Sequence, residues 1–145
     1  MGVSQRVISL YDKPMWDSIA RERLELQQCA SCKRFRYPPG PTCPHCLSMD
    51  YAWQPVSGHG TILSWVVFHR QYFEDFPPPY NAVAVQIAEG PIVVSNLIGD
   101  EPSGSWIGAE VEFVYREHSG RKQHAVRLAN GARLAPQGGG DSPAR

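Results

Sequence analysis

Five segments in the second half of the chain alternate apolar side chains with other residues, and this pattern predicts five β-strands. The segments are residues 61–69, 80–88, 92–98, 110–115 and 124–129. Alternation with a period of two is typical of a strand that packs one face on a core. Glycine-containing turns lie before the first, fourth and fifth segments, as expected between short strands. The succession predicts a small closed barrel of the OB-fold type.

The first of these strands is apolar on both faces. With a period of two, Ile62 and Val66 lie on one face, and Leu63 and Trp65 lie on the other. A strand in a small barrel needs only one face for the core. We therefore expect the Trp65 face to be covered by the N-terminal part of the chain, by a ligand or by another protein.

A helical pattern precedes the strands. Asp12 can cap a helix, Pro14 is tolerated in the first turn, and no further proline or glycine occurs before Pro38. One helical face collects Trp16, Ile19, Ala20, Leu24 and Gln27. The pattern predicts a helix of about three turns that leads directly into the first cysteine.

The four cysteines form two pairs, Cys29 with Cys32 and Cys43 with Cys46, each with a two-residue spacer. This spacing is typical of a rubredoxin-like zinc ribbon with one structural zinc ion. Iron in the same site, with a role in electron transfer, and two disulfides remain alternatives. The absence of an apolar signal segment at the start of the sequence indicates a reducing cytoplasm and disfavours the disulfides. Four sulfur ligands leave no open position for activated water, which argues against metal-dependent hydrolysis.

Composition narrows the classes of function. Fourteen basic residues balance fourteen acidic ones, so no overall charge attracts nucleic acid or an anionic membrane. No apolar run is long enough to span a bilayer. Residues 56–135 contain six basic and eight acidic side chains, whereas a groove that follows a phosphate backbone should be basic. This disfavours the rival reading, a zinc-ribbon and OB-fold protein that binds single-stranded nucleic acid.

Together these patterns predict a mainly β, cytoplasmic protein in four parts. They are an N-terminal helical segment (1–28), a zinc ribbon (29–55), a five-stranded OB-fold barrel (56–135) and a glycine-rich disordered tail (136–145).

Two groups of side chains are candidates for ligand binding. Arg34 and Arg36, between the cysteine pairs, could contact the phosphates of a nucleotide-containing ligand or be ordinary solvated cations. The proline-stiffened loop after the first barrel strand is rich in aromatic residues, and in OB folds such a loop often closes over the ligand. Its candidates are Tyr72, Phe73, Phe76 and Tyr80; the alternative is that they pack on one another.

No catalytic residue is predicted. His69 lies near Tyr72 and Asp75 in the sequence and is a candidate for a general acid or base. However, no serine elbow, spare cysteine or second suitably spaced histidine accompanies it, so a structural histidine is favoured.

The ordered succession of motifs over about residues 14–130 resembles the bacterial and archaeal family of zinc-ribbon and OB-fold acyl-CoA-binding proteins, found alongside thiolase-like enzymes and hydratases. The resemblance depends on Leu26-Gln27-Gln28-Cys29-Ala30-Ser31-Cys32, Tyr37-Pro38-Pro39, Cys43-Pro44-His45-Cys46, Gly58-His59-Gly60-Thr61-Ile62 and Ile107-Gly108-Ala109-Glu110-Val111. It implies an accessory subunit in acyl-CoA metabolism (lipid, steroid or polyketide).

The same resemblance implies that the ribbon and barrel hold part of an acyl-CoA. Such a subunit would form a homo- or hetero-oligomer with a thiolase, ketoacyl synthase or hydratase that carries the catalytic residues. The candidates for acyl-CoA binding are Arg34, Arg36, Trp65, Tyr72, Phe73, Phe76 and Tyr80.

Overall fold

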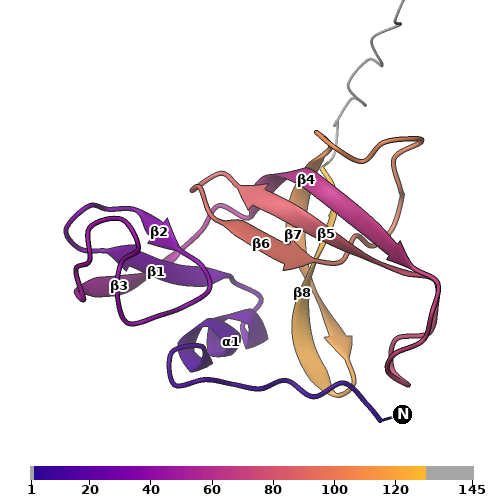
Figure 1. Cartoon of the computed structure of the whole chain (residues 1–145), viewed down its shortest axis with the longest axis horizontal. Helices are drawn as coiled ribbons and strands as arrows, with labels where there is room; N and C mark the ends of the chain where they lie inside the picture. Colours follow the sequence, from indigo (N-terminus) through magenta and orange to yellow (C-terminus); the bar gives the residue numbers. More distant parts are fainter. Residues whose placement is uncertain (1, 130–145) are drawn as a thin grey trace, which may run out of the picture.

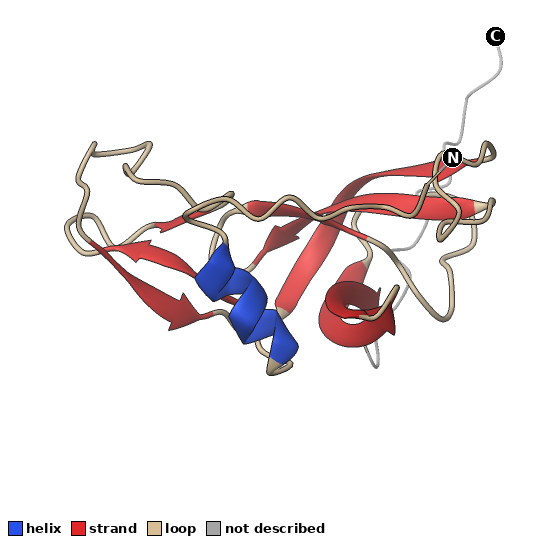
Figure 2. Cartoon of the chain, turned by 90° about the horizontal axis from the view of Figure 1, so that it is seen from below, coloured by secondary structure: helices blue, strands red, loops and turns tan. Residues whose placement is uncertain are grey.

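The chain folds into two antiparallel sheets with one short helix between them (Figures 1 and 2). The computed structural model describes residues 2–129, so the predicted tail lies outside the described residues. The elements are α1 (Lys13–Ala20), β1 (Glu25–Cys29), β2 (Phe35–Arg36), β3 (Tyr51–Pro55), β4 (His59–Phe68), β5 (Tyr80–Ile87), β6 (Ile92–Ser95), β7 (Glu110–His118) and β8 (Arg121–Leu128). None of the helices over residues 2–129 is both long and apolar enough to cross a membrane.

The larger sheet has the strand order β6-β5-β4-β7-β8 and curls into a half-barrel of the OB type (Figure 1). Its two outer strands meet at a single parallel bridge between Leu97 and Val126, where the Ile98 N–H donates to the Val126 carbonyl at 2.8 Å. The five predicted strands are therefore confirmed. The expected barrel is less closed than predicted, because an isolated bridge and a side-chain contact, Ser95 to His124, join this edge to β8 in place of a continuous ladder.

One turn and one close approach between strands show where glycine is required. Ser119 and Gly120 form the two-residue β7–β8 loop, and both have positive φ (51° and 73°), as a type I′ turn demands. At Gly60, where β4 passes between β5 and β7, a Cβ would lie 2.6 Å from Val85 Cγ1 and 2.7 Å from the Gln86 carbonyl oxygen. Only glycine fits at that position without moving β5.

A bulge in β4 corrects the predicted faces of the first strand. Ile62 lies opposite Val85, and Trp65 lies opposite Val83. Trp65 is three residues after Ile62 on β4, whereas their partners are only two residues apart on β5. Because Val83 and Val85 are fully buried and paired residues share a face, Ile62 and Trp65 both face the core. The strict alternation that placed them on opposite faces was wrong, since Leu63 is the extra residue of a β-bulge.

The inner face at Trp65 is covered by the chain itself. Trp106, in the loop between β6 and β7, stacks on Trp65 with ring centroids 5.8 Å apart and an interplanar angle of 14°. Trp106 is only 5% exposed, while Trp65 is half-buried and packs against the core. The expectation that the N-terminal part of the chain, a ligand or another protein covers the Trp65 face is therefore wrong, because Trp106 covers it. A role of Trp65 in ligand binding stays a prediction.

The helix is shorter than predicted. α1 ends at Ala20, Glu22 takes a left-handed φ of 59°, and the following residues enter β1. Leu24 and Gln27, which the helical pattern placed on one face, are buried beside or within β1. A five-residue ladder with β3 outweighs the local helical preference there.

α1 joins the two sheets, because it contacts both β1 and β8 (Figure 2). Ile19 is fully buried, and Trp16 stacks on His124 of β8 at 6.1 Å. Burial lowers the pKa of His124 to about 4, so the ring is neutral at pH 7 and Ser95 Oγ lies 2.8 Å from its Nδ1. His124 is thus a structural histidine that anchors the helix to the barrel.

Candidate functional site

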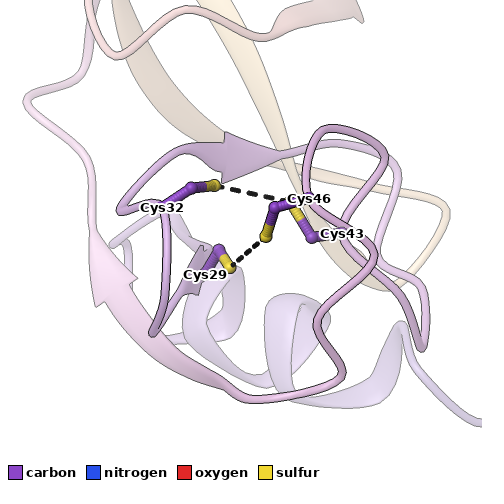
Figure 3. A group of neighbouring side chains, drawn as sticks. All are labelled: Cys29, Cys32, Cys43 and Cys46. Atoms are coloured by element: carbon purple, nitrogen blue, oxygen red, sulfur yellow. Dashed lines mark hydrogen bonds between the residues drawn. The ribbon is translucent and has the colours of Figure 1, made fainter.

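The four cysteines come from two loops that fold alike (Figure 3). In the first, the Lys33 N–H donates to the Cys29 carbonyl at 3.1 Å; in the second, the Leu47 N–H donates to the Cys43 carbonyl at 2.9 Å. Lys33 and Leu47 both have a φ of 64°, which turns each loop back on itself. Each Cys-x-x-Cys segment therefore presents both of its thiols to one point.

The thiols have the geometry of one tetrahedral metal site. All four sulfur atoms lie within 4.8 Å of one another; Cys29 and Cys46 are 3.5 Å apart, and Cys32 and Cys43 are 3.6 Å apart. Ligands about 2.3 Å from a tetrahedral zinc ion are about 3.8 Å from each other. All four cysteines are free, so the alternative of two disulfides is wrong. The donor set fits one structural zinc ion, as predicted.

Backbone N–H groups favour the thiolate form at this site. The Cys32 N–H lowers the pKa of the Cys29 thiol to about 6, and the Cys46 N–H lowers the pKa of Cys43. A thiolate is the form that binds a metal ion. The backbone therefore favours the thiolate form at Cys29 and Cys43 before the ion contributes its own charge. At Cys46 the Ser48 N–H lowers the pKa, but burial and the neighbouring thiols outweigh it and raise the pKa to about 11.

A pocket of about 390 Å³ lies between the ribbon and the barrel, and we call it the junction pocket. It is lined by Arg34, Phe35, Arg36, Tyr37, Pro44 and His45 from the ribbon and by Glu89, Gly90 and Pro91 from the β5–β6 turn. Both arginines predicted as ligand-binding residues lie here. Arg34 is exposed and donates to His45 Nδ1 at 2.8 Å, so His45 is engaged outside the sulfur cluster.

The loop between β4 and β5, which carries most of the predicted aromatic residues, lies at the end of the barrel far from the ribbon (Figure 1). Tyr80 stacks on Phe68 at 4.9 Å and lies 5.4 Å from Phe76, while Tyr72 meets Phe68 edge-on at 6.1 Å. We call Phe68, Tyr72, Phe76 and Tyr80 the aromatic cluster. Phe73 is 45% exposed and has no ring partner among residues 2–129. The structure thus brings three of the four predicted loop residues together and adds Phe68.

A second, smaller pocket of about 250 Å³ opens beside this cluster, and we call it the loop pocket. It is lined by Asp75, Phe76, Pro77, Pro79, Tyr80, Asn81, Asn96, Leu97, Arg116 and His118. Arg116 donates to Asn96 Oδ1 at 3.4 Å, and its Nε is buried without a partner. Arg116 and His118 were not predicted, because both belong to β7, whose proximity to the loop depends on the curl of the sheet.

Asp75 pairs with a different histidine from the one considered in the sequence. His118 Nε2 lies 3.1 Å from Asp75 Oδ2, and Ser119 Oγ and the Ser4 N–H both donate to the same carboxylate at 2.7 Å. Burial raises the pKa of Asp75, but hydrogen bonds from Ser4 and Ser119 outweigh it and hold this pKa well below its ordinary value. His69 is exposed instead. Asp75 therefore anchors the N-terminal segment to the loop and the β7–β8 turn.

The sequence matches two family models, and both describe domains of ChsH2. The model for the ChsH2 rubredoxin-like zinc ribbon domain matches residues 16–51, and the model for the ChsH2 C-terminal OB-fold domain matches residues 53–116. Together the two matches follow the division of the structure into ribbon and half-barrel.

Individual relatives agree with these matches. A probable enoyl-CoA hydratase alpha subunit of Thermomonospora curvata is 40% identical over 107 residues, which are 73% of this chain and 34% of that protein. A DUF35 domain-containing scaffold protein of Pyrococcus furiosus is 35% identical over 83 residues, 56% of this chain and 60% of that protein. The chain therefore spans about a third of the first relative and less than two thirds of the second.

A solved structure resembles most of the chain. The structure described as "Ltp2-ChsH2(DUF35) aldolase" superposes with a TM-score of 0.78 and 32% sequence identity, and the match covers 86% of this chain and 98% of that one. Similarity at this level extends to the relative placement of ribbon, helix and half-barrel.

Proposed function

Because this chain belongs to the ChsH2 (DUF35) family of zinc-ribbon and OB-fold proteins, we propose that it is a non-catalytic subunit that binds an acyl-CoA and assembles with a catalytic enzyme. The relatives support an accessory subunit of acyl-CoA metabolism. The partner is a thiolase-like enzyme or a hydratase, and it carries the catalytic residues. One observation carries this proposal. The match covers 98% of a chain in a solved structure whose description names ChsH2 together with a second protein, Ltp2.

An exposed apolar surface supports assembly with a partner. On one face of the sheet, Val66 lies opposite Ala82, and Ala84 lies opposite Val94. Ile92, two residues before Val94, points to the same side. Val66, Ile92 and Val94 are 49%, 49% and 58% exposed, while the residues between them on β5 and β6 fill the core. We call this set the outer apolar face, and a contiguous patch of this kind is typical of a protein–protein contact.

We expect Val94→Asp to reduce recovery of the catalytic partner at least about tenfold when the tagged chain is purified from native expression levels. An unpaired carboxylate buried in an interface costs several kcal/mol, and about 1.4 kcal/mol already corresponds to a tenfold loss. Ile107→Asp is the matched control, because Ile107 is 61% exposed but lies in the loop before β7. Equal partner recovery with both variants, at unchanged thermal stability, would remove the outer apolar face from the proposal.

The acyl group is assigned to the aromatic cluster and the adjoining loop pocket. The cluster offers a wall of rings held in place by their mutual stacking. Prolines 77 and 79 also line the loop pocket and limit the conformational entropy that would be lost on binding. Since Asp75 is saturated by hydrogen-bond donors, this site fits binding better than acid–base chemistry.

Calorimetry with a series of saturated acyl-CoAs should show affinity that rises with chain length. Each buried CH₂ contributes about 0.8 kcal/mol, or up to about fourfold in affinity. Phe76→Ala should flatten this dependence on chain length while leaving the affinity for unacylated CoA unchanged. Affinity that is independent of chain length, or equal affinity for a single-stranded oligonucleotide, would count against acyl-CoA as the ligand.

A further inference from the structure

Arg36 is a buried cation without a counter-ion. The residue is 4% exposed, and its Nε, Nη1 and Nη2 atoms have no hydrogen-bond partner among residues 2–129. Its guanidinium lies 4.8 Å from the centre of the Tyr51 ring, a contact that offsets only part of the lost hydration. Arginine is almost never fully buried unless it is paired. The folded chain therefore holds a positive charge that the described residues do not balance.

The carboxylate that lines the same pocket does not satisfy this charge. Glu89 lines the junction pocket together with Arg36. Its Oε1 accepts the Ser57 N–H at 2.6 Å, and its Oε2 is buried with no partner. Glu89 is thus held by the backbone of the segment before β4, and Arg36 is left open to another acceptor.

A second cation lies on the same pocket. Arg34, two residues before Arg36, is exposed and is oriented by its hydrogen bond with His45. Arg34 lies just before β2 and Arg36 ends it, and both side chains line the junction pocket. The two guanidinium groups and the His45 ring make the ribbon wall of the pocket rich in N–H donors, which suits a tetrahedral oxyanion.

We propose that the junction pocket binds a phosphate group, which Arg36 and Arg34 hold by charge-assisted hydrogen bonds. The planar guanidinium matches two phosphate oxygens at once, as a lysine could not. Because the nitrogens of Arg36 are shielded from solvent, binding requires a rotamer change in Arg36 or in another residue that lines the pocket. The phosphate belongs to the nucleotide end of a CoA, which rests on the proposed function, or to free phosphate; the chemistry of recognition is the same.

The first test measures thermal unfolding of the zinc-loaded full chain with inorganic phosphate at constant ionic strength. The melting temperature should rise with phosphate concentration and not with chloride. Arg34→Met, which changes an exposed side chain, and Arg36→Met should each weaken phosphate binding by about tenfold or more. Arg127→Met is the matched control for charge: Arg127 pairs with Glu112 and does not line the pocket, so this variant should respond to phosphate as the parent does.

The unliganded variants supply a second readout. Arg36→Met should be at least as stable as the parent without phosphate, since an apolar side chain of similar length replaces an unpaired buried charge. If Arg36→Met and Glu89→Gln instead lose stability equally, Arg36 is neutralised within the chain and the phosphate site is overturned. A parent protein that millimolar phosphate does not stabilise would overturn it as well.

Coenzyme A and pantetheine separate this inference from the proposed function. Competition between CoA and phosphate, with no effect of pantetheine, assigns the pocket to the nucleotide end of CoA. Arginine-dependent phosphate binding without CoA competition keeps the phosphate site and removes its link to acyl-CoA. Acyl-CoA binding that is unchanged in Arg34→Met and Arg36→Met overturns the assignment of this pocket to CoA and leaves the proposed function intact.

Discussion

Replacing Cys43 with serine is expected to release the zinc ion and to unfold the ribbon. Cys43 is 1% exposed, and its sulfur lies 3.6 Å from that of Cys32. The three-stranded sheet of the ribbon includes a strand of only two residues, β2. We expect so small a sheet to be unstable without the metal ion. Structural zinc sites contribute about 10–16 kcal/mol of binding free energy to the folding of small metal modules, more than the stability of most whole domains.

Elemental analysis of the parent should find about one zinc ion per chain, and Cys43→Ser should contain close to none. Amide hydrogen exchange should then show loss of protection in β1–β3 and retention in β4–β8. Ser31→Ala is the matched control, because Ser31 lies in the first metal loop, its hydroxyl donates to Ser48 Oγ at 3.2 Å, and the substitution leaves its backbone N–H in place. A metal-free parent with a protected ribbon would refute the structural role of zinc, and visible thiolate-to-iron absorption would identify iron instead.

Trp106→Ala is expected to lower the free energy of unfolding of the half-barrel by about 3–5 kcal/mol, as is typical of a buried tryptophan. Trp106 is 5% exposed and belongs to the core cluster with Ile62 and Val83. Its removal leaves a cavity beneath Trp65, on which it stacks. Urea denaturation monitored by circular dichroism measures the change.

Trp65→Ser should also reduce stability, because the bulge in β4 turns Trp65 toward the core. The double variant with Trp106→Ala should show a coupling energy of about 0.5–1.5 kcal/mol, the range found for stacked aromatic pairs. Val66→Ala, the next residue on β4 but 49% exposed on the outer apolar face, should stay within about 0.5 kcal/mol of the parent. If Trp65→Ser leaves stability unchanged and abolishes ligand or partner binding, Trp65 belongs to a functional surface and not to the core.

The parts of the protein that the sequence determined are those that depend on local spacing. Two Cys-x-x-Cys segments predict one metal site, because neighbouring residues in a tight turn must face the same ion. Alternation over residues 80–88 predicted that β5 packs one face on the core, and Val83 and Val85 are indeed fully buried. The turn at Ser119-Gly120 was likewise predicted, although the strands on either side of it extend further toward the turn than predicted, to His118 and from Arg121.

Tertiary structure decided the features that depend on contacts between distant segments. The helix stops at Ala20 because pairing with β3 is worth more than local helical preference. The bulge at Leu63 reverses the face of Trp65, since one extra residue shifts the alternation of every side chain that follows. The sequence alone left Arg34 and Arg36 as phosphate contacts or as solvated cations. In the structure Arg36 is buried and Arg34 is exposed, where the ribbon approaches the β5–β6 turn. Burial at such a junction depends on how two folded units pack against each other, and a local pattern carries no information about that distance.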